Sequence, residues 1–442
     1  FQGAFQFDDV HALFENPHLD RWQTFVGHLD HMVRPVLYAT FFIDRTLYGE
    51  SPMGYHLLNL VLHLGSGLFI YRILIRAVTQ DARQIPFWTS LVFLVHPIQT
   101  EAVTYVSGRA SGLMSFFYLL ALFLYIHASE VQDIPKAYRR YLSGAIASFV
   151  LALGSKETAM TFPLVLLVWD TVIHRLSGRS LRTAILSRHL PFWIVLLLAG
   201  LWVCSHPRYS ALMHFSFNLR PLWENVLSQM HATSYAILLL FCPWNQNFDH
   251  DLAQFHSIAQ WPLPLDLFLL GGLAAAASLT VRRLPLLSFG IMWFFIQCLP
   301  TAVIPRADLL SERNLYLASI GLILATVVCG VRLAQWLREV ALVHRIRPVG
   351  SYAIAVAIVI VLSTFTYQRN TLYRDQLSLW TDTVAKSPHK ARPHNNLGHA
   401  FALLGEWDRA IDEFRIAAQL DSDYVLAQDN LRDAYLHRVG RR

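Results

Sequence analysis

Two neighbouring carboxylates near the start of the chain are the residues best suited to acid–base chemistry. Asp8 and Asp9 are adjacent, so one can act as a general base while the other orients it or holds the second substrate. Aspartate also often begins a helix, and a helix starting near Val10 would explain the pair without catalysis. No third oxygen ligand stands at a fixed spacing, which argues against a metal. We therefore expect Asp8 and Asp9 to be catalytic acids.

Two further pairs place a cation beside a glutamate. Lys156 precedes Glu157, and Arg313 follows Glu312. Arginine can grip a phosphate with two hydrogen bonds and lysine acts as a point charge, so we expect Lys156 and Arg313 to bind a phosphate. Ordinary surface ion pairs are the alternative, since basic side chains at a membrane boundary extend toward water. We expect further help from two phosphate ligands, Arg109 and His96, and from four supporting residues, Glu101, Glu157, Glu312 and Arg34.

His96 and the triplet Asp249-His250-Asp251 are weaker signals. A histidine before Pro97 can simply mark the end of a helix, although imidazole titrates near neutral pH and could bind a phosphate or a sugar hydroxyl. The triplet looks like a D-x-D metal motif, but its spacing alone supplies too few ligands. We expect neither a metal nor another cofactor.

Ten long apolar segments separate these residues and indicate an all-α, multi-pass membrane protein. Apolar stretches become candidate transmembrane helices as they approach ~20 residues. Basic residues fall into alternate loops, such as 72–83 and 175–188, which marks those loops as cytoplasmic. Every candidate residue then lies on the opposite face, together with Arg306 and Asp308. The ten segments are about 54–75, 86–99, 112–127, 141–155, 159–173, 189–205, 264–281, 285–304, 314–337 and 349–367.

An eleventh apolar segment, about 223–243, carries Glu224, Gln229 and His231. If it crossed the membrane, the alternation of basic loops would break downstream. We therefore expect it to be re-entrant or to lie at the outer surface. Ten crossings leave both chain ends on the same, extracytoplasmic side.

The composition supports a membrane protein and argues against a nucleic-acid partner. Hydrophobic residues make up 54% of the 442 residues and charged residues 15%, whereas soluble domains carry about 25% charged residues. The net charge of +6 is spread over loop ends without forming a basic patch. The four cysteines lie in or beside apolar segments without metal-type spacing, so we expect neither a disulfide framework nor a metal site.

We divide the chain into a membrane domain, residues 1–370, and an extracytoplasmic domain, residues 371–442. Residues 1–53 form the first outer loop, with an amphipathic helix over Val33–Leu47 lying in the interface. We expect a further helix to precede Phe1 in the full protein. Near the other end, a pattern typical of a tetratricopeptide repeat, with a period near 34 residues, predicts a helix–turn–helix pair. Its residues are Leu397, Gly398, Phe401, Leu404, Gly405, Trp407, Ala410, Ile411, Phe414 and Ala417.

Taken in order, these motifs resemble the TMTC-type family of transmembrane and tetratricopeptide-repeat protein O-mannosyltransferases and their bacterial relatives. The likeness covers nearly the whole chain, and the combination is far more specific than any single string. The matching strings are Phe7-Asp8-Asp9, Asn16-Pro17, Arg34-Pro35, Gly54-Tyr55-His56-Leu57-Leu58-Asn59, His96-Pro97-Ile98-Gln99-Thr100-Glu101-Ala102-Val103, Ser107-Gly108-Arg109, Ser155-Lys156-Glu157-Thr158-Ala159, Ser311-Glu312-Arg313-Asn314-Leu315-Tyr316 and His394-Asn395-Asn396-Leu397-Gly398.

This resemblance implies a GT-C glycosyltransferase fold and transfer of a mannose-like sugar from a polyprenyl phosphate to a protein serine or threonine. It implies an inverting, metal-independent reaction in which Asp8 is the base and Asp9 supports it. The protein acceptor could bind through the repeat. The chain departs from the family in its short repeat array and in lacking the family's first helix. No N-x-S/T sequon occurs, which favours a bacterial inner membrane with a periplasmic site over an endoplasmic reticulum membrane with a luminal one.

Three other functions are open on the residues alone. The same chemistry could serve a lipid or glycan acceptor, although a peptide-binding repeat argues against this. A non-catalytic scaffold could dock partners on the repeat, but it would gain nothing from costly ionisable groups at a membrane boundary. A transporter would need charged groups near mid-membrane or broken helices, and the charges here gather at one boundary.

Overall fold

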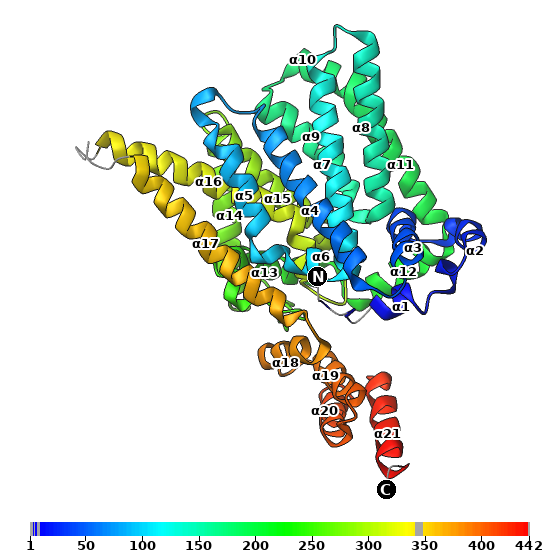
Figure 1. The fold of residues 1–442 in the computed structure, drawn as a ribbon. Helices are drawn as coiled ribbons and strands as arrows, with labels where there is room; N and C mark the ends of the chain where they lie inside the picture. The colour runs from blue at the N-terminus through cyan, green and yellow to red at the C-terminus, as the bar shows by residue number, and fades with distance from the viewer. Residues whose placement is uncertain (1–2, 4, 7–8, 341–347, 441–442) are drawn as a thin grey trace.

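A computed structural model describes residues 3, 5–6, 9–340 and 348–440 of the chain, and the described elements are all helices. The membrane domain is a helical bundle (Figure 1), and ten of its helices fall on the ten predicted apolar segments. They are α4 (Pro52–Leu74), α5 (Gln84–Val95), α7 (Arg109–Glu130), α8 (Pro135–Ser155), α9 (Phe162–Val168), α11 (Leu190–Ser205), α14 (Leu263–Thr280), α15 (Pro285–Val303), α16 (Leu315–Val340) and α17 (Pro348–Leu372).

Seven spans in the described part of the chain are long and apolar enough to cross a membrane, so the protein is a multi-pass membrane protein. Three of the ten predicted spans, those at α5, α8 and α9, are not long and apolar enough to be among these seven. Helix α5 has 12 residues, or about 18 Å of helix, against ~30 Å of hydrocarbon. The seven spans are Pro52–Leu74, Val106–Glu130, Gly178–Ser205, Leu263–Thr280, Pro285–Val303, Glu312–Leu337 and Tyr352–Leu372.

The segment predicted not to cross forms α13 (Leu222–Phe241), which is not among the seven candidate spans. Two of its polar residues form hydrogen bonds to backbone carbonyl groups of neighbouring segments. Asn225 Nδ2 donates to the carbonyl oxygen of Ala302 at 2.8 Å, and Gln229 Nε2 donates to that of Leu309 at 2.9 Å. Because buried carbonyl groups need partners, these amides join α13 to the last turn of α15 and to the loop that follows it.

Short elements cover the lower end of the bundle in Figure 1. The amphipathic stretch predicted over 33–47 is helix α3 (Pro35–Tyr48), which buries Leu37 and Phe41 and exposes Ile43 and Leu47. Near it, α12 (Pro207–Leu219) buries none of its residues. The remaining elements of the membrane domain are α1 (Asp9–Leu13), α2 (Trp22–Gly27), α6 (Thr100–Thr104), α10 (Gly178–Ala184), the 3-10 helices at Pro17–Leu19, Leu29–His31, Gln80–Ala82, Pro97–Gln99, Val106–Gly108, Glu157–Thr161, Pro243–Asn245 and Glu312–Asn314, and the π-helices at Trp169–Ile173 and Ile185–His189.

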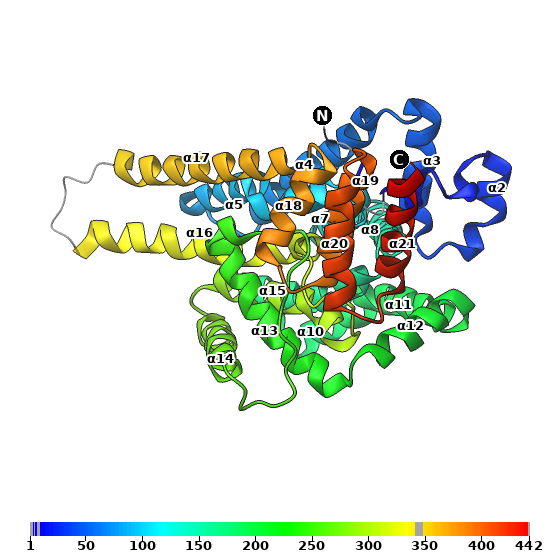
Figure 2. The ribbon, with the colours of Figure 1, turned by 90° about the horizontal axis from the view of Figure 1, so that it is seen from below.

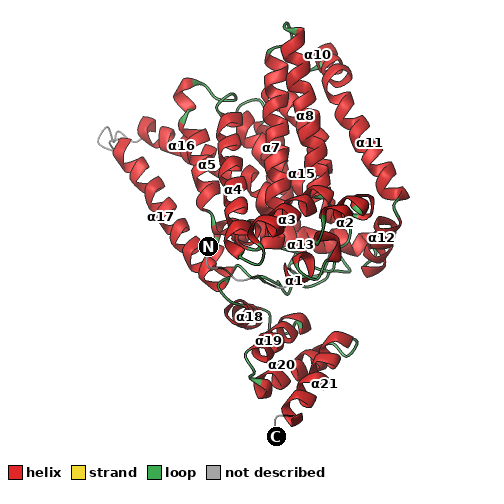
Figure 3. Cartoon of the chain, turned by 45° about the vertical axis from the view of Figure 1, so that its right-hand side comes forward, coloured by secondary structure: helices red, strands yellow, loops and turns green. Residues whose placement is uncertain are grey.

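The C-terminal helices α18 (Gln376–Lys386), α19 (Ala391–Leu403), α20 (Trp407–Leu420) and α21 (Val425–Gly440) lie across the lower end of the bundle (Figures 2 and 3). Gly398 of α19 allows close packing, because a Cβ there would come within 2.7 Å of the Phe414 ring on α20. The predicted domain boundary at 370/371 falls in the last turn of α17. Whether the pair α19–α20 is a tetratricopeptide repeat stays a prediction.

Helices α15 and α16 pack closely at two glycines, Gly290 and Gly321. A Cβ on Gly321 would lie 2.2 Å from the carbonyl oxygen of Gly290, so Gly321→Ala must push the two helices apart. Overpacking of this kind typically costs about 1–3 kcal/mol, and we expect a lower melting temperature in detergent. Gly330→Ala on the same helix is the matched control, since nothing lies within 4 Å of its Cβ position. Equal melting temperatures for both variants would contradict the prediction.

Candidate functional site

A cavity of about 620 Å³ opens at the end of the bundle that carries α1–α3 and α12. Five basic side chains line it, and they come from five separate parts of the chain. They are Arg34, Lys156, Arg208, Arg306 and Arg313. The rest of the wall is formed by Ala12, Glu15, Asn16, Pro17, His18, His28, His31, Met32, Leu37, Tyr38, Phe41, Ser107, Ala110 and Ser111.

Lys156 stands where α8 ends, because its extended backbone stops the helix and directs the chain into the next short element. Its Nζ donates to Ser111 Oγ at 2.7 Å and to Asn314 Oδ1 at 2.6 Å, and the side chain is 3% exposed. Burial, reinforced by the positive charges of Arg306 and Arg34, lowers the pKa of Lys156 well below its usual value. A phosphate near Nζ would therefore stabilise the protonated amine, which burial otherwise disfavours.

Glu157 holds two of the cavity's arginines in place. Arg34 donates two hydrogen bonds at 3.0 Å to the two carboxylate oxygens, and Arg306 Nη2 donates to Oε1 at 2.6 Å. Burial alone would raise the pKa of Glu157, but Arg34, Arg306 and Lys156 outweigh it and hold the pKa well below its usual range. Glu157 is thus a carboxylate that orients two cations, which matches a supporting role.

Arg313 is oriented by Glu101. The backbone N–H of Arg313 donates to Glu101 Oε2 at 2.9 Å, the guanidinium lies 3.3 Å from Oε1, and it stacks over the ring of Tyr105. Burial raises the pKa of Glu101 although Arg313 opposes the shift. The guanidinium keeps part of its surface on the cavity, since its side chain is 30% exposed.

Asp9 adjoins the same cavity through Ser107. Asp9 Oδ1 accepts hydrogen bonds from the backbone N–H of Ser107 at 2.7 Å and from its hydroxyl at 2.5 Å, and Oδ2 accepts from the backbone N–H of Gln6 at 2.8 Å. Ser107 itself lines the cavity. Asp8, the predicted base, lies outside the described residues. The structure therefore brings Asp9, Lys156 and Arg313 to one region.

Arg109 does not line the cavity but is buried behind it. Its guanidinium pairs with Asp44 at 2.6 Å and donates to Thr40, Asn59 and the Tyr55 carbonyl oxygen at 2.7–3.1 Å. With these donors engaged and 0% of the side chain exposed, the residue is arranged to hold α3, α4 and α7 together. This position does not suit direct contact with a phosphate.

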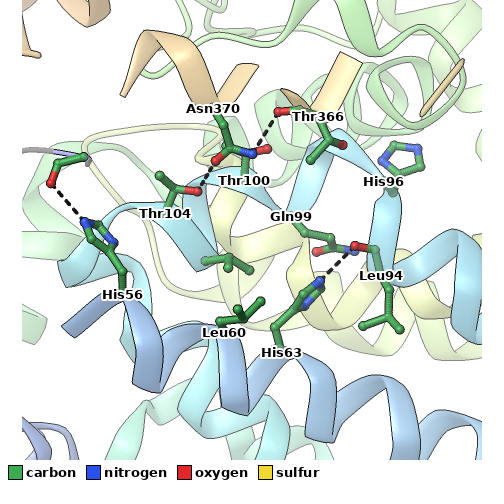
Figure 4. Close-up of a pocket in the computed structure, with 12 residues that line it drawn as sticks. His56, Leu60, His63, Leu94, His96, Gln99, Thr100, Thr104, Thr366 and Asn370 are labelled. Carbon is green, nitrogen blue, oxygen red and sulfur yellow. Dashed lines mark hydrogen bonds between the residues drawn. The ribbon is translucent and has the colours of Figure 1, made fainter. Parts of the chain in front are cut away.

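His96 lies in another, smaller cavity of about 260 Å³ between α4, α6 and α17 (Figure 4). Its Nε2 donates to the carbonyl oxygen of Leu240 at 2.9 Å, and its Nδ1 accepts from the backbone N–H of Ile98 at 3.1 Å. Its bonding is that of a helix terminator, which was the simpler of its two interpretations.

Glu312 also points away from the cavity. Its Oε1 accepts from the backbone N–H of Asn247 at 2.6 Å and from His250 at 3.0 Å, and the side chain is fully buried. The D-x-D residue Asp249 pairs with Arg392 at 2.5 Å. Among the described residues, no group of three or more histidines, cysteines and acids could hold a metal.

Sequence reasoning missed several lining residues. Arg306 was placed on the outer face without a role, and Arg208 went unnoticed because a lone arginine after a proline is a weak signal. His18, His28 and His31 stand near one another at the wall, with the rings of His18 and His28 4.1 Å apart. His18 and His31 lie in two separate 3-10 helices, and no pattern in the sequence shows that these two short elements pack side by side.

Comparison with known proteins gives a consistent set of relatives. A protein O-mannosyl-transferase of Caenorhabditis elegans is 25% identical over 96% of this chain and 60% of its own length. Protein O-mannosyl-transferase Tmtc3 of Drosophila melanogaster is 27% identical over 96% of this chain and 54% of its own, and human TMTC1 is 25% identical over 97% and 54%. The chain thus spans little more than half the length of these relatives.

No family model matches the chain, and no solved structure matches it either. The likeness to the mannosyl-transferases nevertheless extends over both the membrane helices and the C-terminal helices, since the alignments cover 96–97% of the chain. The resemblance drawn from the motifs is confirmed: over nearly its whole length, the chain is similar to proteins that are all named TMTC-type protein O-mannosyl-transferases.

Proposed function

We propose that the protein transfers a mannose-like sugar from a polyprenyl-phosphate carrier to a serine or threonine hydroxyl of a protein. The observation that carries the proposal is the set of five basic side chains that line the large cavity. Three of them are held in place by carboxylates: Arg34 and Arg306 pair with Glu157, and Arg313 pairs with Glu101. A phosphodiester donor brings one negative charge, and its phosphate gains a second when the bond to the sugar breaks. Cations already held in place favour that build-up of charge.

The reaction is a single displacement. Asp8 takes the proton of the acceptor hydroxyl, whose oxygen attacks the anomeric carbon from the face opposite the phosphate. The bond from the anomeric carbon to the phosphate oxygen breaks, its electron pair leaves with the phosphate, and the anomeric centre inverts. Asp9, tied to Ser107 at the cavity wall, anchors the chain beside Asp8. Lys156 and Arg313 hold the phosphate, so the reaction requires no metal.

Two of the predicted phosphate ligands receive other roles in this proposal. Arg109 and His96 have their polar groups engaged away from the cavity, whereas Arg34 and Arg306 line it. We therefore assign the assisting contacts to Arg34 and Arg306. Helix α3 contributes Leu37, Tyr38 and Phe41 to the wall, and such apolar cover excludes the water that would hydrolyse the donor.

We place the site on the extracytoplasmic side, in a bacterial inner membrane with the site in the periplasm or in an endoplasmic reticulum membrane with a luminal site. The support is the positive-inside rule: the basic segment that joins α4 to α5 and the basic helix α10 lie at the end of the bundle opposite the C-terminal helices (Figure 1).

We propose that the pair α19–α20, with its tetratricopeptide-like pattern, presents a protein acceptor to the cavity. A lipid or glycan acceptor is the second candidate, and the C-terminal helices across the cavity end of the bundle favour the protein. Mass spectrometry of the reaction products distinguishes the two, because a modified peptide and a modified lipid differ in mass.

The proposal is tested by thermal unfolding of the purified protein with a panel of undecaprenyl-phosphate and dolichyl-phosphate sugars. A ligand that binds only the folded state raises the melting temperature, and we expect a rise with a phosphate-linked mannose and transfer of its sugar to protein. The carrier phosphate without sugar is the control for the phosphate contacts. No rise with any donor, and no transfer, would refute the proposed function.

A further inference from the structure

The C-terminal helices are joined to the membrane domain by a cluster of ion pairs at the loop between α15 and α16. Arg392 donates to Asp308 Oδ1 at 2.7 Å and to Asp249 Oδ2 at 2.7 Å. Lys390 lies 3.4 Å from Asp308 and also pairs with Asp249. Asp249 is 2% exposed and the other three side chains 25–30% exposed, so this is a partly shielded network rather than a surface pair.

The same loop is held from its other side by α13 and the residues just before it. Arg220 donates to the carbonyl oxygen of Arg306 at 2.6 Å, close to where Asn225 and Gln229 bind the backbone of Ala302 and Leu309. The loop backbone is therefore fixed between α13 and α19. Removing either set of contacts leaves it supported on one side only.

This loop presents cations to the large cavity. Arg306 stands two positions before Asp308 and donates to Glu157 at 2.6 Å. A second connection reaches Glu312, the neighbour of Arg313. Arg369 lies 3.9 Å from Glu312 and 3.2 Å from Asp382 of α18. Both routes thus run from the C-terminal helices to residues that flank an arginine of the cavity.

We propose that Asp308 and Arg392 are positioning residues through which the C-terminal helices hold Arg306 in its donor-binding place. This inference rests on the proposed function and extends it. The C-terminal helices then form part of the donor site as well as an acceptor platform. Small displacements of a charge-bearing group strongly reduce catalysis, so an arginine on irregular backbone needs such a support. A protein acceptor that shifts α19 would adjust the donor site through the same pair.

The direct test uses the full-length protein and hydrogen–deuterium exchange. In Asp308→Asn and in Arg392→Met, we expect faster exchange of backbone amides in residues 304–309. Arg409→Met is the matched control, since Arg409 lies on α20 and pairs with Glu406 within the C-terminal helices. Asp308→Glu keeps the charge and should largely restore the wild-type exchange. Unchanged exchange in Asp308→Asn would overturn the proposal whatever the enzyme's activity is.

Donor kinetics separate positioning from simple attachment. With undecaprenyl-phosphate mannose, we expect Asp308→Asn to raise the donor KM about tenfold, which corresponds to about 1.4 kcal/mol, with a smaller change in kcat. In an Arg306→Met background, Asp308→Asn should have almost no further effect, because residues acting through one another are not additive. An undiminished effect in that background, or faster exchange with an unchanged KM, would overturn the positioning role. A wild type that neither binds nor transfers would instead refute the proposed function.

Discussion

Replacing Lys156 with methionine is expected to weaken donor binding about a hundredfold, since loss of one partner from a buried charge contact costs about 2–5 kcal/mol. The ammonium is almost fully buried and held by two neutral oxygens, those of Ser111 and Asn314. Because burial disfavours the ammonium when no anion is present, the methionine variant should keep or gain thermal stability without donor. Donor affinity and melting temperature, measured on the same preparations, check both expectations.

Lys136→Met is the matched control for this substitution. Lys136 lies in the first turn of α8, at the end opposite Lys156, and is exposed. We expect it to leave donor affinity unchanged. Lys156→Arg keeps a cation and should retain part of the affinity if the site is free to accommodate the larger head group. Wild-type donor affinity in Lys156→Met would contradict the phosphate contact.

The same lysine should make donor binding depend on pH. Its pKa lies well below 10.5 without ligand, and a phosphate favours the protonated form. Donor affinity should therefore be highest below the lowered pKa and fall as pH rises through it, with uptake of a proton on binding. Calorimetry in buffers of different ionisation enthalpy measures that uptake. The pH-dependent fall should be absent in Lys156→Met.

Asp8→Asn is expected to abolish transfer while donor binding persists. The amide cannot accept the acceptor's proton, and general-base catalysis typically contributes about 10²–10⁴-fold to a rate. The phosphate contacts come from other residues, so the donor-induced rise in melting temperature should remain near that of the wild type. Steady-state transfer and thermal unfolding of the one variant measure the two effects separately.

Glu15→Gln tests the main alternative to Asp8 as the general base. Glu15 is a carboxylate that lines the cavity, and it is the natural competitor for the role of base. We expect Glu15→Gln to retain most of the transfer activity. Full activity in Asp8→Asn together with loss of activity in Glu15→Gln would move the role to Glu15. Loss of donor binding in Asp8→Asn would show that the residue acts on the fold instead.

Much of the architecture follows from local patterns in the sequence. All ten bundle helices fall on predicted apolar segments, because a helix facing lipid must satisfy its own backbone and carry apolar side chains along its length. The helix expected at residues 33–47 is α3, since its period of apolar residues is a local property. The assignment of crossings was less exact, because α5 is helical but too short for a usual span.

The roles of single polar residues were harder to predict, because a side chain's partner can lie far away in the chain. Arg109 and His96 stand in motifs as distinctive as that of Lys156, yet their partners, Asp44 and the backbone at Leu240, are fixed only by packing. A short motif does not by itself show whether its residues serve the cavity or the fold.

Hydropathy, charge bias and short motifs lie in contiguous residues, so they were enough to indicate a helical membrane protein, the positions of its helices and the family it resembles. The cations that share one cavity could be identified only from the folded chain. Folding brought Arg34, Lys156, Arg306 and Arg313 together and joined the C-terminal helices to them through Asp308. The physical reason is that electrostatic interactions depend on distance in space, and chain folding brings residues separated by hundreds of positions within a few ångströms.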